Sequence, residues 1–314
     1  MFNAFKDSIY ELAKNDKRVV LIIIDQDAGL DHMQKEMPDQ YFMEGISEAN
    51  TMGVASGLAA DGFIPFIVNH ASFGVRRCYE QIVLDACLQE RPIRIIGMGA
   101  GVATAHLGPT HTTIEDIALM RSLPEMTVIA PCDAVEMKKL MPQMVNWPRP
   151  IYVRLARYGK PIVSREEDKI EIGKAVLLYK GEKTDKNVLL ISTGAMTSCA
   201  INAANELKNQ GISSSVLHIH TIKPLDKETI IEQSRQAGLI VTLEDHLLAG
   251  GLGSACLEVL MDNMDPKDLP RVHRIGFPDK FIHEYGSQEY LFKTLGLEPL
   301  QIAAKIKSFL NIKQ

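Results

Sequence analysis

The chain has 314 residues, of which 46% are hydrophobic and 23% charged. This composition is typical of a globular protein and excludes a disordered, collagen-like or low-complexity chain, while the length favours two domains. The formal net charge is −5, from 34 Lys and Arg against 39 Asp and Glu. Because no basic run is long enough to follow a phosphate backbone, the sequence predicts no nucleic-acid partner.

The N-terminal stretch MFNAFKDSIYELAKNDKR mixes acids with its apolar residues, so it predicts no signal peptide. No apolar run reaches the roughly 18–20 residues of a membrane helix, and we expect no membrane partner. The five cysteines form no CxxC pair. This pattern indicates reduced thiols in a cytoplasmic protein rather than a disulfide or zinc framework. Cys132 in APCDA could be a nucleophile, but a small buried hydrophobe is favoured.

Two blocks of the chain alternate short β-branched apolar runs with segments of helical spacing, which is typical of parallel α/β layers. The first block predicts strands at Val19–Ile24, Ile64–Asn69, Ile93–Met98, Thr127–Ala130 and Ile151–Leu155, and helices at Ser47–Ala60, Arg77–Glu90 and Ile114–Ser122. The second predicts strands at Asn187–Ser192, Ser214–Ile219 and Leu239–Leu243, and helices at Thr197–Gln210, Lys227–Ala237 and Gly253–Met261. A charged stretch separates the blocks, so we expect domains at 1–165 and 187–314 joined by a linker at 166–186.

The segment MEGISEANTMGVASGLAA predicts a turn followed by a helix of small residues. Gly53 and Gly57 leave little side-chain volume there, so another group could approach the helix closely. Glu48 lies near the helix start among apolar neighbours, where a carboxyl group could share or donate a proton. Alternatively, Glu48 is a first-turn acid that the helix dipole favours.

Two further segments place polar side chains near the carboxyl ends of predicted strands, where parallel α/β sheets keep ligand sites. The first, VNHASFGVRR, predicts a short loop that presents His70, Phe73, Arg76 and Arg77, and Phe73 could stack on a flat ring or belong to the core. In the second, GMGAGVATAHLGPTH, His106 and His111 flank a Gly-Pro turn. A metal site made by these two histidines lacks a third ligand, which favours substrate contact.

In the second block, LEDHLLAGGLGS places three glycines between a strand and a helix: Gly250, Gly251 and Gly253. Such a turn could cradle an anion at the helix N-terminus. It could equally allow close packing of the strand and the helix. The sequence leaves both interpretations open.

The three segments of the first block, in this order and spacing, closely resemble the pyrimidine-binding domain of transketolases and deoxyxylulose-phosphate synthases, which are thiamine-diphosphate enzymes. The most specific stretch is GPTHTTIEDIALMRSLPEMTVIAPCDAVE, and HTIKPLD and GFPDKFIHEYGSQEYLFKTLGL are similar to the family's C-terminal domain. The resemblance covers nearly the whole chain. It implies an α/β fold of two domains, a thiamine-diphosphate pyrimidine-binding domain with a mostly parallel sheet and a transketolase C-terminal-like domain.

The resemblance also implies roles for individual residues. In such enzymes the glutamate that matches Glu48 hydrogen-bonds the pyrimidine ring of the cofactor, which carries the difficult chemistry. A guanidinium such as that of Arg157 suits an anionic end of the substrate. We therefore expect no metal ligand in this chain, catalytic roles for Glu48 and His111, cofactor contacts from Glu48, Phe73 and Arg76, and substrate contacts from His70, His106, His111 and Arg157.

The sequence lacks the Gly-Asp-Gly segment that, with a later Asn, binds magnesium and the diphosphate in full-length members of the family. The chain is therefore expected to be the C-terminal subunit of a split transketolase, which transfers a two-carbon ketol unit between sugar substrates. A separate amino-terminal subunit would supply the diphosphate and magnesium site, most simply in a two-plus-two heterotetramer.

Two departures from the family pattern concern the sugar. Transketolases carry Asp before the Gly of the histidine turn, where this chain has Leu107, and a further histidine where it reads GMGAG. A buried acceptor for a hydroxyl is worth about 1–3 kcal/mol, so its loss favours a deoxygenated or otherwise modified sugar. Synthase chemistry or 2-oxoacid dehydrogenase beta-subunit activity remains an alternative, and a non-catalytic regulatory homologue is an alternative of another class.

Overall fold

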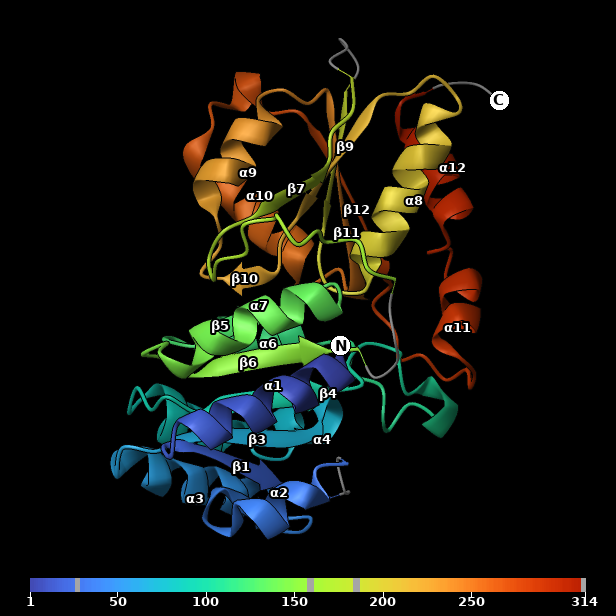
Figure 1. The fold of residues 1–314 in the computed structure, drawn as a ribbon. Coiled ribbons are helices and arrows are strands. Elements are labelled where there is room, and N and C mark those ends of the chain that lie inside the picture. The colour runs from blue at the N-terminus through green and yellow to red at the C-terminus, as the bar shows by residue number, and fades with distance from the viewer. Residues whose placement is uncertain (26–28, 157–160, 183–186, 312–314) are drawn as a thin grey trace.

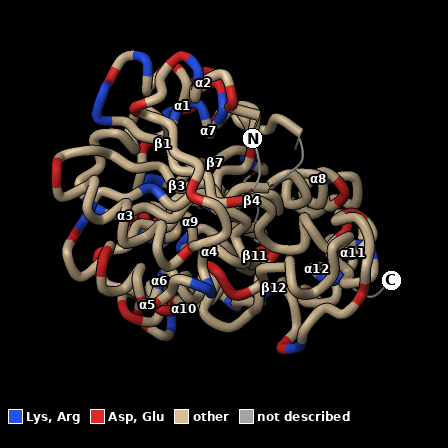
Figure 2. Tube along the Cα trace, turned by 90° about the horizontal axis from the view of Figure 1, so that it is seen from below, with Lys and Arg blue, Asp and Glu red and all other residues tan. Residues whose placement is uncertain are grey.

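The computed structural model describes residues 1–25, 29–156, 161–182 and 187–311 (Figure 1). They form two α/β bodies, built around a seven-stranded and a five-stranded sheet. Acidic and basic residues are interspersed around the trace (Figure 2). Within the described residues, no helix combines the length and apolar character needed to cross a membrane.

The first sheet has the strand order β10-β5-β6-β4-β3-β1-β2. Its strands are β1 (Val19–Ile23), β2 (Tyr41–Met43), β3 (Ile64–His70), β4 (Arg94–Met98), β5 (Thr127–Ile129), β6 (Ile151–Leu155) and β10 (Thr221–Lys223). All neighbours are parallel except β10, which runs antiparallel to β5. Every residue of β1, β3 and β6 is buried, as a parallel sheet covered on both faces requires.

Two buried apolar clusters cover the two faces of this sheet, one beneath α1 and α7 and the other beneath α3 and the helices after β3. Helix α7 (Ala134–Val145) is capped by Asp133, whose side chain accepts from the amide of Glu136 at 3.0 Å. The helical elements of this body are α1 (Phe2–Asn15), α2 (Asp31–Glu36), η1 (Pro38–Gln40), α3 (Glu48–Ala60), α4 (Ala71–Arg76), α5 (Tyr79–Gln81), η2 (Ile82–Cys87), η3 (Ala105–Leu107), α6 (Asp116–Ser122) and α7 (Ala134–Val145).

The second sheet has the order β12-β11-β8-β9-β7, and only β7 runs antiparallel to its neighbour. Its strands are β7 (Val176–Tyr179), β8 (Val188–Ser192), β9 (Ser214–His218), β11 (Leu239–Leu247) and β12 (Arg271–Phe277). The helical elements are α8 (Met196–Lys208), α9 (Lys227–Ser234), α10 (Leu252–Asn263), η4 (Pro266–Asp268), α11 (Gln288–Thr294) and α12 (Pro299–Phe309). The family-based expectation of two α/β domains with mostly parallel sheets is thus confirmed.

The structure differs from the sequence-based prediction in several elements. Strand β7 lies inside 166–186, which the sequence predicts as a linker, and β10 follows β9 in the chain yet completes the first sheet. The single helix predicted at Arg77–Glu90 is instead α5 followed by the π-helical η2, and the loop predicted after β3 is helix α4. Apolar spacing cannot separate an α-helix from a π-helical turn, because both place successive turns on one face.

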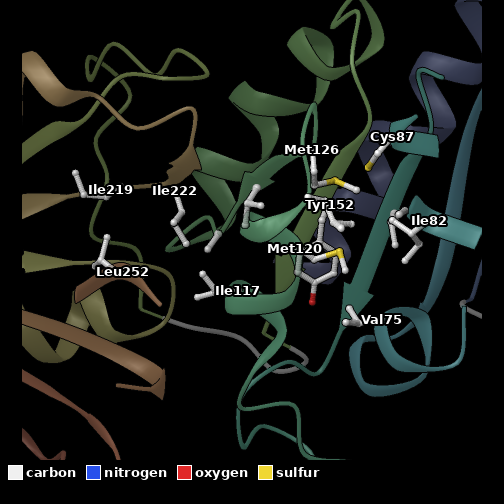
Figure 3. Packing of buried hydrophobic residues seen from close by; sticks show 14 of the residues in the cluster. Val75, Ile82, Cys87, Ile117, Met120, Met126, Tyr152, Ile219, Ile222 and Leu252 are labelled. Atoms are coloured by element: carbon white, nitrogen blue, oxygen red, sulfur yellow. The ribbon is translucent and has the colours of Figure 1, made fainter. Parts of the chain in front are cut away.

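The two bodies share one continuous apolar core (Figure 3). Ile117, Met120 and Tyr152 of the first body belong to the same buried cluster as Ile219, directly after β9, and Leu252, the first residue of α10. Because a contiguous buried cluster defines one core, the two sheets are held as a unit. Side chains at the end of one sheet can therefore keep a fixed relation to loops of the other.

Candidate functional site

The candidate site lies where strand β3 ends and helix α4 begins. His70 is both the last residue of β3 and the N-cap residue of α4, and its side chain is buried. Phe73 follows in the first turn of α4 and is half-buried. Strand β3 pairs with β1 and β4, so this is the carboxyl end of a central parallel strand, the expected place for a ligand.

Three aromatic rings converge at this point. The ring of His111 lies edge-on to Phe73 with 5.1 Å between centroids, and 5.7 Å from the ring of His70, which is itself 5.9 Å from Phe73. The turn that carries His111 is fixed by backbone contacts: its amide donates to the carbonyl of Gly108 at 3.1 Å, and the Thr104 hydroxyl donates to its carbonyl at 2.7 Å. Residues distant in sequence thus meet in one cluster.

Glu48, the first residue of α3, supplies a buried carboxylate next to these rings. Its Oε1 accepts from Asn69 Nδ2 and from Arg77 Nη1, both at 3.2 Å. The guanidinium of Arg77 also lies over the ring of Phe73, 4.0 Å from the centroid, and so connects the carboxylate with the aromatic ring. In the described part of the chain, both of these hydrogen bonds to the carboxylate go to Oε1 rather than Oε2.

Arg77 is a residue of the candidate site that the sequence placed in this loop without a role, since Arg76 was the arginine expected at the cofactor. In the structure Arg76 Nη2 donates to the carbonyl of Thr112 at 2.9 Å, and its Nε pairs with Glu115. It therefore ties α4 to the segment after His111. The sequence favours a loop here, whereas the structure forms helix α4, whose C-cap residue Arg77 lies over the ring of Phe73.

The other predicted site residues lie next to the turn of His111 or outside the described residues. His106 is exposed in η3, five residues before His111. Leu107, which the sequence analysis singled out, is 42% exposed beside the turn. Arg157 lies outside the described residues.

The glycine turn of the second body is filled by a carboxylate of the chain itself. Glu244 on β11 accepts from the amides of Leu252 and Gly253, at 2.7 and 2.9 Å, at the N-terminus of α10. A Cβ at Gly251 would lie 1.9 Å from Glu244 Oε2, so the turn requires glycine there. Burial raises the pKa of Glu244 to about 7, against the two amide hydrogen bonds that lower it. Of the two open interpretations, close packing holds, because Glu244 occupies the place that an anion would take.

A buried arginine joins the two bodies behind the site. Arg154 on β6 donates through Nε to Asp116 Oδ2 at 2.8 Å, and through Nη2 to the carbonyl of Asp245 on β11 at 2.9 Å. Its Nη1 also pairs with the Asp245 carboxylate, and the Tyr152 hydroxyl donates to Asp116 at 2.7 Å. Burial, with the Asp116 charge, raises the pKa of Tyr152 well above its usual range, so the phenol stays a donor.

A second buried polar contact contains the atoms most suited to hold a metal: Cys132, Glu136 and His218 place ligand atoms within 4.8 Å of one another. Both ring nitrogens of His218 are already engaged, Nε2 with Glu136 at 2.9 Å and Nδ1 with Thr197 at 2.8 Å. Burial opposes ionisation of Glu136, but His218, His220 and the amide of Cys132 together outweigh it and lower the pKa of Glu136 to about 2. Burial raises the pKa of the Cys132 thiol, which is therefore neither a nucleophile nor a ready thiolate ligand. The cluster acts as an inter-body hydrogen-bond network.

Comparison with known proteins matches residues 1–159 to the family described as transketolase, pyrimidine binding domain, and residues 177–302 to the transketolase C-terminal domain. The chain is 35% identical to a 6-deoxy-6-sulfo-D-fructose transketolase subunit of a Clostridium species, over 96% of this chain and 91% of that protein. It is also 35% identical to one of the subunits of the apulose-4-phosphate transketolase of Phocaeicola vulgatus, over 94% and 92%.

A full-length synthase and a solved structure are also similar to this chain. The 1-deoxy-D-xylulose-5-phosphate synthase of Caldanaerobacter subterraneus is 36% identical over 97% of this chain, which spans only 48% of that enzyme. A solved structure described as a split-gene transketolase in an inactive beta4 tetramer is similar with a TM-score of 0.88 and 32% identity, covering 99% of this chain and 98% of that one.

Proposed function

Because this chain belongs to the transketolase family, whose pyrimidine-binding and C-terminal domains it carries, we propose that it is the C-terminal subunit of a split transketolase. It would transfer a two-carbon ketol unit between sugar substrates. The observation that carries the proposal is the convergence of Glu48, His70, Phe73 and His111 at the end of β3. The near-complete mutual coverage with two split-subunit relatives supports it.

The residues of the site fit the pyrimidine ring of thiamine diphosphate, on which this family depends. Glu48 offers Oε2 in a buried position, and the half-buried ring of Phe73 beside it offers a face for stacking. When bound, the cofactor supplies a nucleophilic carbon that cleaves the donor ketose. Glu48 would hold or receive a proton at the ring, and Phe73 would fix the plane in which the ring lies.

The remaining groups would position the reacting atoms. Arg77 orients the Glu48 carboxylate through Oε1, and its long, partly exposed side chain can leave the face of Phe73 when a ring arrives. His70 and His111 present two imidazoles, each able to give or take a proton, where the oxygens of a sugar would lie. In the same proposal, Arg76 acts on the cofactor side indirectly, through its bonds to Thr112 and Glu115, and His106 and Arg157 contact the substrate.

We propose a modified sugar as the substrate. Leu107 presents an apolar, partly exposed side chain next to the turn of His111. The two split-subunit relatives are named for 6-deoxy-6-sulfo-D-fructose and apulose 4-phosphate, which supports this choice. Leu107→Asp should improve the use of ordinary ketose phosphates, measured as kcat/KM. If these donors are used no better, Leu107 does not set the preference.

A separate amino-terminal subunit would bring the diphosphate and magnesium site, in a two-plus-two heterotetramer. An apolar face beside Glu48 supports an interface there: Gly53, Val54 and Gly57 of α3 are exposed, next to Leu84 and Leu88 of the following helical segment. A cytoplasmic location is proposed as well, because five widely spaced cysteines without a CxxC pair are typical of reduced thiols.

The test begins with mild tagged purification from the source cells. We expect a second chain with a Gly-Asp-Gly segment to co-purify and to confer thiamine-diphosphate binding in the presence of magnesium. In the reconstituted complex, Glu48→Gln should lower kcat by about 100-fold or more with assembly intact, whereas Glu80→Gln, an exposed acid on α5, should not. A chain that purifies alone, with cofactor binding restored by no partner, would favour the non-catalytic alternative. Normal turnover by Glu48→Gln would refute the mechanism.

Synthase chemistry is a second candidate, favoured by the 36% identity with a deoxyxylulose-phosphate synthase. The same complex distinguishes the two reactions, because synthesis from pyruvate releases carbon dioxide whereas ketol transfer does not. We expect no carbon dioxide release with pyruvate and glyceraldehyde 3-phosphate. Release at the rate of ketol transfer would replace the first proposal by the second.

A further inference from the structure

The turn that carries His111 is contacted by an aromatic ring of the second body. A Cβ at Gly108 would lie 2.6 Å from atoms of Tyr285, including the hydroxyl oxygen, so the Tyr285 ring packs on the α-carbon of Gly108. The carbonyl of Gly108 accepts from the amide of His111 at 3.1 Å. The ring therefore packs on the turn that carries His111, although Tyr285 itself belongs to the loop between β12 and α11.

Tyr285 is not a core residue, because its side chain is 66% exposed. Its loop is nevertheless anchored, since Ile282 is buried in the apolar cluster of the second body. Leu107, the residue before Gly108, is also partly exposed. The ring is thus held against the turn while most of its surface stays open beside the site.

We propose that Tyr285 is a specificity-determining residue, through which the second body contributes to sugar selection; the inference rests on the proposed function. Leu107 and the ring face of Tyr285 give the turn a mostly apolar edge, with the Tyr285 hydroxyl against Gly108. A carbon–hydrogen face of a sugar can pack on an aromatic ring. A sugar oxygen directed at Leu107 or at the face of the ring would lose its water partners without gaining another. The edge therefore selects a donor that lacks an oxygen at the carbon it faces.

The experiment uses the complex reconstituted with its amino-terminal subunit, and compares Tyr285→Ala and Tyr285→Phe with the unchanged complex. Phe281→Ala is the matched control, because Phe281 is an aromatic residue of the same loop that is 73% exposed. Donors are 6-deoxy-6-sulfo-D-fructose and fructose 6-phosphate, which differ in the group on C6, with glyceraldehyde 3-phosphate as acceptor. The readout is the ratio of the two kcat/KM values, with KM and kcat reported separately.

We expect the unchanged complex to prefer the deoxy sulfonate, and Tyr285→Ala to reduce that preference by about fivefold or more through KM, with kcat nearly unchanged. Tyr285→Phe should keep the preference, as should Phe281→Ala. The dissociation constant for thiamine diphosphate should not change in any variant, which separates selection from assembly.

Three results would overturn the inference: an unchanged ratio in Tyr285→Ala, equal losses for both donors, or no preference in the unchanged complex. If the unchanged complex transfers no ketol unit to any acceptor, the proposed function itself fails, and the inference fails with it. If the complex is active and only the ratio is unmoved, the inference alone is wrong.

Discussion

Replacing Arg154 with methionine removes the charge that joins the two bodies. Arg154 is 4% exposed and pairs with Asp116 and Asp245, which are buried as well. The substitution leaves two buried carboxylates without a counter-charge, and breaking a buried ion pair from one side costs about 3–5 kcal/mol. Because both carboxylates lose the same partner, we expect the upper part of that range, a large fraction of a typical total of about 5–15 kcal/mol.

Urea unfolding of the chain at pH 7 measures this cost as a shift of the midpoint at constant m value. Arg18→Met is the control, because the Arg18–Asp16 pair is exposed, with 57% of the arginine side chain accessible, and should cost less than about 1 kcal/mol. Adding Asp116→Asn and Asp245→Asn to Arg154→Met should restore part of the stability. The reasoning fails if Arg154→Met costs no more than the control, or if the triple variant is no more stable than the single one.

Glu244→Gln tests a pH dependence. Burial raises the pKa of Glu244 from 4.5 to about 7, so between these values the folded chain holds a proton that the unfolded chain has lost, and this group's contribution to stability falls as pH rises. The wild type should lose about 2.5 kcal/mol of unfolding free energy relative to the variant between pH 5 and pH 8 in urea titrations, and a constant difference would contradict this. Gly251→Ala should lower the free energy of unfolding by at least about 2 kcal/mol, because its Cβ would meet the Glu244 carboxylate. Gly53→Ala is the control: the Cβ has open space there, so this variant should be as stable as the wild type or more stable in the isolated chain. Equal effects of the two substitutions on the free energy of unfolding would refute the clash. Arg77→Ala should raise the Kd for thiamine diphosphate in the complex about tenfold or more through loss of the bond to Glu48, and an equal effect of Arg76→Ala would show that the two arginines are not placed differently.

The central strands could be predicted from the sequence, because burial on both faces leaves continuous apolar runs. Strand β6 has the predicted bounds, and β1, β3 and β4 differ from prediction by one residue at one end. The edge strands β7 and β10 could not be predicted in the same way. Each is three or four residues long, and its identity depends on an antiparallel partner in the fold rather than on a local pattern.

The convergence of His70, Phe73 and His111 was also within reach of the sequence, since the carboxyl ends of neighbouring parallel strands meet at one edge. The choice between Arg76 and Arg77 was not, because it depends on α4 being a helix where the sequence favours a loop. Similarly, the three glycines before α10 predicted that some group lies close to the turn, but they did not show that this group is the side chain of Glu244. Their functional roles stay predictions until the variants above are measured.

The segment that carries His111 is held from both bodies, which explains why sugar selection can involve the second one. The amide of Leu247 on β11 donates to the carbonyl of Ile114 at 2.8 Å, and the amide of Ala118 donates to Nε2 of the neighbouring His246 at 3.2 Å. Between these contacts lies Asp116, bound to Arg154 and through it to Asp245. Since the same segment begins at the turn on which the Tyr285 ring packs, the position of His111 is set by contacts on both sheets. The second body is therefore part of the geometry of the site, even though Glu48, Phe73 and both site histidines all belong to the first.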